Sequence, residues 1–201
     1  MIELSDYDNP FDAIADFENK LATYTGSPYA VATDCCTHAM ELCLRYLKPS
    51  ETITIPYRTY LSVPMLMHKL QLDYEIEEYE WEGRYQLGNT SIWDSARMLY
   101  MDMHHPSQFQ CLSFGRTKPL EIGRGGAILT DNKEAYEWFK KASYDGRDIS
   151  ISPWQDQKEF QVGYHYMMRP KECIDGINGF GNINNAYSHT YPDIRKINIA
   201  S

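Results

Sequence analysis

The strongest constraint on the fold is a regular alternation of short apolar segments with amphipathic ones. The apolar segments have the length and side chains of strands, clearest at 29–33, 53–56, 109–113 and 127–130 and weaker at 74–79 and 91–94. The amphipathic segments repeat their apolar side chains at helical spacing, at 10–26, 37–47, 60–70 and 132–144. This alternation predicts an α/β fold of three layers, in which helices flank a mostly parallel sheet.

The length of 201 residues allows one domain with a small appendage. We expect residues 1–150 to form the α/β domain. After Arg147 the pattern weakens, and residues 150–163 have the composition of a loop. Three glycines interrupt the helical pattern of residues 169–187. Residues 151–201 are therefore expected to be a loop and an irregular helical segment that packs on the domain or on a partner subunit.

Charge and cysteine content exclude several classes of protein. The formal net charge of −9 disfavours a nucleic-acid-binding surface. The first ten residues lack the pattern of a signal peptide, and no apolar run is long enough to cross a membrane. Five cysteines form no disulfide framework in a chain of this length, which favours a reducing compartment. We expect a cytoplasmic protein without a membrane or nucleic-acid partner.

Polar residues follow several of the predicted strands directly. Cys36 and Thr37 join a strand to a helix, where free N–H groups favour an anion, although Thr37 could simply cap the helix. Asp94 ends an apolar strand, so its carboxylate needs a cationic or N–H partner unless it is a turn residue. Ligands of open α/β sheets bind beyond the carboxyl ends of the strands. These positions are therefore the candidate site.

Lys118 has an unusual position, between an apolar strand and a glycine-rich segment. A lysine in a partly apolar cleft loses some preference for its charged form and becomes a better nucleophile, able to form an imine with an aldehyde. A phosphate-binding loop would require a helix after the lysine, and Pro119 argues against that. The remaining alternative is a loop lysine that reaches solvent.

Histidine and cysteine residues raise the question of a metal site. His38, the pair His104 and His105, and the adjacent Cys35 and Cys36 are the candidates. No metal-type spacing connects them. We predict no metal site.

Several segments in order resemble the DegT/StrS-type sugar aminotransferases, fold-type I enzymes that use pyridoxal 5′-phosphate (PLP). Five segments carry the resemblance, in the family's order: the opening helix, a phosphate turn with its helix, a Pro-x-x-Thr-aromatic motif, a Glu-Asp-Ala-Ala-Gln motif, and a Ser-Phe-x-x-x-Lys segment followed by Gly-Gly. In this sequence they are residues 17–26, 30–44, 55–60, 93–97 and 113–128. A fainter match is residues 163–166, where the family has Gly-x-Asn-x. The fold that this implies is the large, PLP-binding domain of that enzyme type, over residues 1–150.

The resemblance implies a role for each candidate residue. Lys118 would form the imine with PLP and move the α-proton, and Asp94 would pair with the ring nitrogen. The other implied cofactor contacts are Cys36, Thr37 and Ser113 at the phosphate, Tyr60 against the ring, Arg97 near its phenolic oxygen, and His165 at the phosphate of a partner subunit. A homodimer is therefore implied.

The sequence departs from the family pattern in ways that affect the expected function. Arg97, Cys36 and His165 replace the glutamine, glycine and asparagine of the family. Few residues separate the strand at 74–79 from Asp94, where the family has additional strand–helix units, and the family's C-terminal domain would begin where this sequence ends. Much of the substrate-recognition apparatus is therefore expected to be absent.

Two functions follow from this resemblance. The first is a PLP-dependent aminotransferase that moves an amino group from an amino acid to a nucleotide-linked keto sugar, as in polysaccharide biosynthesis. The second is a non-catalytic PLP-binding or assembly module that retains the fold. Dehydration of a sugar is a third possibility, but the family's dehydratases have another residue in place of Lys118.

Overall fold

The computed structural model describes residues 1–185 and 191–198, and its centre is a five-stranded sheet. The strands lie in the order β1 (Tyr29–Thr33), β7 (Gly126–Thr130), β6 (Phe109–Ser113), β5 (Ile92–Asp94) and β4 (Tyr85–Gln86). Four of them were predicted from their apolar character. The two-residue strand β4 was not predicted, because so short a segment has no periodicity to detect.

The strand directions differ from the predicted, mostly parallel order. Only β5 and β6 run parallel, whereas β1 with β7, β6 with β7 and β4 with β5 are antiparallel pairs. The reason lies in the connection between β6 and β7. A parallel return needs a crossover, usually a helix, and residues 114–125 contain no helix in the structure. The α/β class is confirmed, with a mixed sheet.

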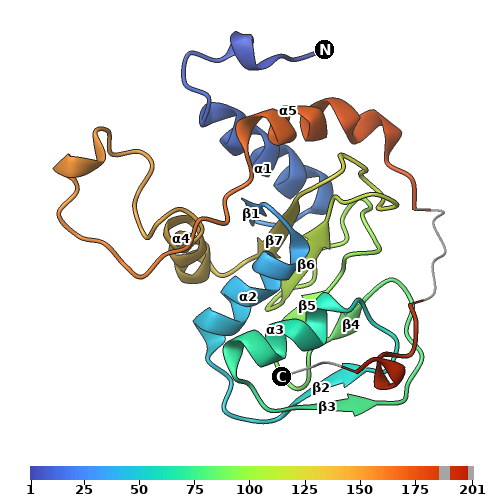
Figure 1. The fold of residues 1–201 in the computed structure, drawn as a ribbon. Helices are drawn as coiled ribbons and strands as arrows, with labels where there is room; N and C mark the ends of the chain where they lie inside the picture. The colour runs from blue at the N-terminus through green and yellow to red at the C-terminus, as the bar shows by residue number, and fades with distance from the viewer. Residues whose placement is uncertain (186–190, 199–201) are drawn as a thin grey trace.

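Helices cover both faces of this sheet (Figure 1). Helices α1 (Asp12–Thr25) and α5 (Pro170–Gly179) pack together on one face, and α2 (Cys36–Leu47) and α4 (Lys133–Ala142) cover the other. Strand β1 shows why both faces are needed, since Ala30 and Ala32 face the α1 side while Val31 faces α2. The three predicted layers are thus present.

A second, two-stranded sheet lies beside the main one. Strands β2 (Ile53–Pro56) and β3 (Tyr74–Glu77) are parallel, and α3 (Ser62–Leu70) forms the crossover between them. Four short 3₁₀ helices complete the described elements: η1 (Leu4–Asp6), η2 (Trp154–Asp156), η3 (Phe180–Asn182) and η4 (Ile194–Lys196). Within the described residues, no helix is both long and apolar enough to span a membrane.

Local sequence signals account for most helix boundaries. Helix α1 stops at Gly26, which adopts the left-handed conformation with φ of 71°. Helix α4 begins after Asn132, whose side chain accepts a hydrogen bond from the N–H of Ala135 at 3.0 Å. The helical pattern of residues 169–187 becomes α5, which ends at Gly179. Residues 186–190, including Tyr187, lie outside the described part.

Candidate active site

The start of α2 forms one wall of the candidate site. Cys36 is the first residue of the helix and is buried, and Thr37 donates a hydrogen bond from Oγ1 to Oγ of Ser62 at 2.8 Å. Gly126 of β7 lies so close that a Cβ there would be 2.5 Å from the backbone of Cys35 and Cys36. Burial, with the charge of Asp94 nearby, raises the pKa of the Cys36 thiol. The thiol is therefore neutral, and the helix N–H groups are the polar feature here.

Asp94 lies at the carboxyl end of β5 and is buried. Its Oδ1 accepts a hydrogen bond from the N–H of Ala96 at 2.9 Å, and its Oδ2 accepts one from the hydroxyl of Tyr85 at 2.8 Å. Burial raises the pKa of Asp94, and the charges of Lys118 and Arg97 act in the opposite direction. A buried carboxylate that receives two hydrogen bonds from neutral donors is suited to bind a cationic group.

Tyr85 was not identified from the sequence. Its hydroxyl lies 2.6 Å from Oγ1 of Thr59 as well as 2.8 Å from Asp94, and its ring is buried. It therefore connects the strand of Asp94 to the segment that follows β2. No local sequence signal marks this role, because Tyr85 belongs to the short strand β4.

Lys118 lies in the loop between β6 and β7 and is half-buried. Its Nζ donates a hydrogen bond to the hydroxyl of Tyr191 at 3.1 Å. The charge of Lys118 acts on both Asp94 and Cys36, which indicates that the three residues share one site. Lys118 also lines a cavity of about 1090 Å³ between its own loop and the end of α5, but neither Asp94 nor Thr37 lines that cavity.

Aromatic and basic side chains surround the same place. Tyr60, 59% exposed, has its ring centre 6.1 Å from that of Tyr191. The guanidinium of Arg97 lies 5.4 Å from the centre of the Tyr191 ring, and the Trp81 ring is stacked against that ring at 6.1 Å. Tyr191 was not identified from the sequence, since 73 positions separate it from Lys118.

The structure thus brings together most of the residues singled out in the sequence. Asp94 and Ser113 end neighbouring strands at one edge of the sheet, and Gly126 faces Ser113 there. His165 is the exception within one chain. Its side chain is 79% exposed, and its Nδ1 lies 3.3 Å from Asp145.

A cluster around His38 lies next to the start of α2. The side chains of Asp34, Cys35 and His38 offer potential metal ligands within 4.8 Å of one another. Asp34 is already engaged, because its oxygens contact Nδ1 of His38 at 2.6 Å and the guanidinium of Arg124 at 2.8 Å. Although burial acts to lower it, the hydrogen bond to Asp34 raises the pKa of His38 to about 9. The cluster is an ion-pair network in this arrangement.

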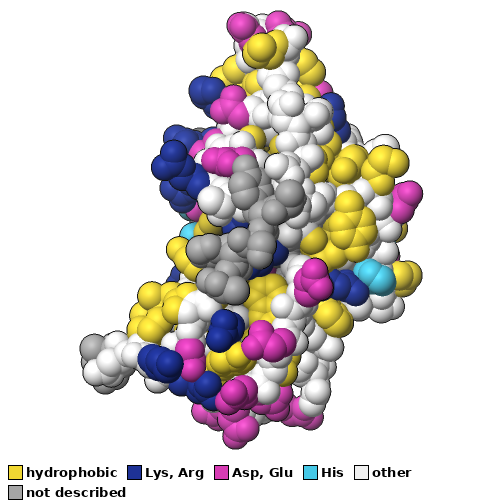
Figure 2. Space-filling view, turned by 90° about the vertical axis from the view of Figure 1, so that its right-hand side faces the viewer, with side chains coloured by type: hydrophobic (Ala, Val, Ile, Leu, Met, Phe, Trp, Pro, Cys, Tyr) yellow, Lys and Arg dark blue, Asp and Glu magenta, His cyan; other side chains and the backbone are white. Residues whose placement is uncertain are grey.

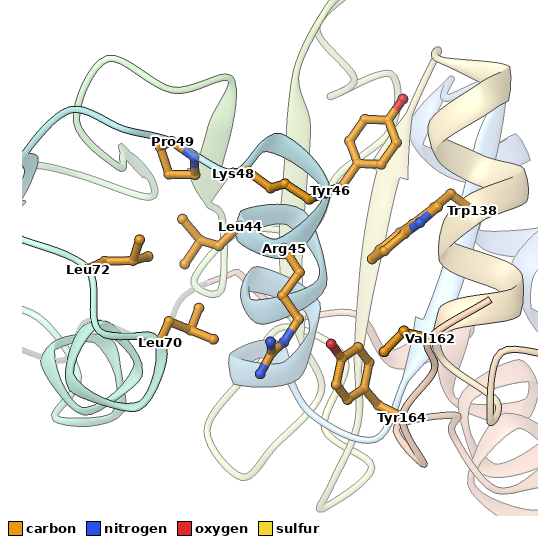
Figure 3. Close-up of a pocket in the computed structure, with 10 residues that line it drawn as sticks. All are labelled: Leu44, Arg45, Tyr46, Lys48, Pro49, Leu70, Leu72, Trp138, Val162 and Tyr164. Carbon is orange, nitrogen blue, oxygen red and sulfur yellow. The ribbon is translucent and has the colours of Figure 1, made fainter.

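A separate cavity lies at the other end of α2, roughly 18 Å along the helix axis. Figure 3 shows this cavity of about 760 Å³, into which side chains from α2, α4 and the segment before α5 point. The Arg45 guanidinium lies 4.5 Å from the ring centre of Tyr164 there. Its lining includes neither Lys118 nor Asp94, so it is not part of the candidate site.

The comparisons with known proteins identify a family. The family model described as the DegT/DnrJ/EryC1/StrS aminotransferase family matches residues 5–71 and 103–185. The chain belongs to this family. The match includes Cys36, Thr37 and Lys118, whereas residues 72–102, with Asp94 and Arg97, lie between the two matched segments. No curated protein matches the sequence significantly.

Solved structures show the same fold. AtS13 from Actinomadura melliaura is similar with a TM-score of 0.70 at 16% identity, over 84% of this chain and 59% of that one. DesV from S. venezuelae has a TM-score of 0.63 at 15% identity, over 82% and 55%. The GDP-4-keto-6-deoxymannose-3-dehydratase ColD has 0.63 at 13% identity, over 84% and 60%. The chain therefore spans less than two thirds of the length of these proteins.

Proposed function

We propose that this chain is a PLP-dependent aminotransferase that moves an amino group from an amino acid to the keto group of a nucleotide-linked sugar. One observation carries the proposal. The amine of Lys118, the buried carboxylate of Asp94 and the start of α2 lie at one edge of the sheet. Membership of the aminotransferase family supports the same function.

The residues of the site fit PLP. A protonated ring nitrogen beside Asp94 would offset the cost of burying this carboxylate. Thr37 and Ser113 carry hydroxyl groups near free N–H groups of α2, a donor set that suits a phosphate. Lys118 offers the primary amine that an aldehyde requires.

Each side chain then has a defined task. Asp94 would hold the proton on the ring nitrogen, and Tyr85 keeps the carboxylate oriented. Tyr60 would cover the ring, and Arg97 would supply positive charge beside it. When bound, PLP would supply the electron sink that makes the α-proton of an amino acid acidic. Lys118 would be the base that takes this proton and the acid that returns one.

Absorbance and chemical trapping test this proposal. We expect the purified protein with added PLP to be yellow and borohydride to attach the cofactor covalently to Lys118, as shown by peptide mass. Lys118→Ala should lose the trapped product while it retains the same unfolding temperature as the wild type. A wild-type protein that takes up no PLP would contradict the proposal.

A non-catalytic module is the second candidate, and a specific observation favours it. Residues 72–102, which contain Asp94 and Arg97, lie outside the match to the family model. Addition of glutamate to the PLP-loaded protein separates the two candidates. Loss of the yellow colour with release of 2-oxoglutarate supports the aminotransferase, whereas PLP uptake without this reaction supports the module. The dehydratase alternative remains disfavoured by Lys118.

The proposed site includes His165 from a partner subunit. The exposed imidazole of His165 follows an arm, residues 147–163, that projects from the body of the chain (Figure 1). The arm carries large apolar side chains that are 39–76% exposed: Ile151, Trp154, Phe160 and Val162. Such a patch is typical of a surface that a protein partner covers. We therefore propose a homodimer in which each arm extends toward the other subunit.

A further inference from the structure

Residues 191–197, within the last described segment of the chain, place a tyrosine inside the candidate site. The Tyr191 hydroxyl accepts the hydrogen bond from Nζ of Lys118 at 3.1 Å. Its ring also lies near Tyr60 and Arg97, with the distances of 6.1 Å and 5.4 Å given above. These are three of the side chains proposed to contact PLP. Tyr191 therefore uses contacts that a bound cofactor would need.

The segment is anchored next to β2. The N–H of Ile194 donates to the carbonyl of Tyr57 at 2.9 Å, and Arg58 forms a β-bridge with Asp193. The Ile194 side chain is 3% exposed and joins the larger apolar core. The buried Ile194 side chain, with the partly buried Ile197, holds the segment in a defined position close to Lys118.

Charge also favours this position. The guanidinium of Arg195 contacts Glu78 at 2.7 Å and Asp193 at 2.8 Å. Glu78 belongs to a group of exposed acidic side chains on and after β3: Glu75, Glu77, Glu78, Glu80 and Glu82. Figure 2 shows acidic side chains gathered at the lower end of the molecule, where β3 lies. Ion pairs at such exposed positions are weak, so Ile194 and the backbone contacts beside it carry most of the anchoring.

We propose that residues 191–197 form a displaceable strap that closes the Lys118 site within the same chain. The strap holds the amine through the Tyr191 hydroxyl and blocks it with the Tyr191 ring, and an aldehyde must displace both to react. That the displacing aldehyde is PLP rests on the proposed function. The blocking of the amine itself does not depend on it.

The first measurement is the reactivity of Lys118 in the absence of PLP. A small acetylating reagent is added to each protein, and mass spectrometry follows acetylation of Lys118, with the exposed Lys141 as internal reference. Tyr191→Ala removes the ring and the hydroxyl, and Tyr191→Phe removes only the hydroxyl. We expect acetylation of Lys118 to accelerate about fivefold or more in Tyr191→Ala, and by less in Tyr191→Phe, with Lys141 unchanged.

Two further variants complete the experiment: Ile194→Ala is a second test of the strap, and Tyr7→Ala is the control. Ile194→Ala weakens the anchor but retains Tyr191, and it should also accelerate acetylation of Lys118. Tyr7→Ala removes a tyrosine near the N-terminus, whose hydroxyl contacts Asp16, and should leave the rate unchanged. Equal rates of Lys118 acetylation in the wild type, Tyr191→Ala and Ile194→Ala would overturn the proposal.

A second measurement uses PLP itself as the probe. Borohydride trapping should be faster in Tyr191→Ala than in the wild type, and slower trapping in this variant would overturn the proposal, because Tyr191 would then help to bind the cofactor. If acetylation accelerates but no variant takes up PLP, the strap is supported and the proposed function fails. The two proposals can therefore fail separately.

Discussion

At the scale of single residues, the buried charge of Asp94 lowers the stability of the fold and at the same time suits the site to bind a cationic group. Its carboxylate is buried, and burial raises its pKa above the ordinary value of 3.8. For an acid, a raised pKa in the folded state means that the ionised form destabilises the fold. This penalty is present at neutral pH and disappears as the pH falls through the raised pKa toward 3.8.

We expect Asp94→Asn to stabilise the protein without PLP by about 1 kcal/mol at neutral pH. The amide retains the bond from Ala96, and Tyr85 can accept from the amide while it donates to Thr59. The gain should shrink as the pH falls through the raised pKa toward 3.8, because the wild-type carboxyl then takes up a proton. Urea unfolding at neutral pH and at a series of lower pH values measures this. PLP affinity should fall about tenfold or more, since a charged hydrogen bond is lost. A variant less stable than the wild type at neutral pH would show that burial of the Asp94 charge does not destabilise the fold.

His38 provides a second prediction at this scale. The imidazole of His38 should titrate at about 9, because its hydrogen bond to Asp34 outweighs the effect of burial. A raised histidine pKa stabilises the fold fully below the ordinary value of 6.5, and this contribution is lost as the pH rises through about 9. NMR titration of the ring measures the pKa directly. Asp34→Asn should return it toward 6.5, and a wild-type pKa at or below 6.5 would show that burial dominates.

At the scale of elements, Glu41 connects α2 to its neighbours. Its side chain is fully buried, and it contacts Arg45 on the same helix at 2.7 Å, Lys69 of α3 at 2.8 Å and the Tyr166 hydroxyl at 3.0 Å. Burial acts to raise the pKa of Glu41, but hydrogen bonds from Lys69 and Arg45 hold it below its ordinary value. The network therefore stabilises the fold at neutral pH and weakens as the pH falls through this lowered pKa.

We expect Glu41→Ala to reduce the free energy of unfolding by about 2 kcal/mol, less than for a fully buried pair because Lys69 and Arg45 remain partly hydrated. For a protein of this size, this corresponds to a decrease of about 4–8 °C in unfolding temperature. Glu137→Ala is the matched control. Glu137 is also on a helix with a lysine partner, but it is 61% exposed, so calorimetry should show little change. Equal effects of both substitutions would show that the Glu41 network is not stabilising.

The elements also show what the sequence could predict. Local signals such as Gly26, Asn132 and the apolar segments placed the helices and longer strands correctly. The strands that precede Asp94 and Lys118 were among them, so the edge that carries the candidate site could be predicted. The antiparallel return of β7 could not be read from periodicity, because direction depends on the connection rather than on the strand. Tyr85 and Tyr191 reach the site only through distant contacts, which no local pattern records.

At the scale of the whole molecule, the unexplained position is that of His165. It is exposed and paired with Asp145, whereas Asp94 and Ser113 end neighbouring strands of the main sheet. The apolar arm that precedes it gives a physical reason for association of two chains, since burial of Trp154 and Phe160 would remove both from water. If two chains associate in this way, each site contains Lys118 from one subunit and His165 from the other.

Mixed dimers test this arrangement. Lys118→Ala and His165→Ala homodimers each lack one residue in both sites, and we expect little or weakened trapping of PLP by borohydride in either. After unfolding and refolding together, a mixed dimer contains one site with neither residue and one site with both. PLP trapping should therefore return to the Lys118 of the His165→Ala subunit. Trp154→Ser in both chains is the control, because it should reduce dimer formation in sedimentation experiments and abolish the recovery. A wild-type chain that sediments as a monomer at all concentrations, or a mixture that recovers no trapping, would contradict the shared site.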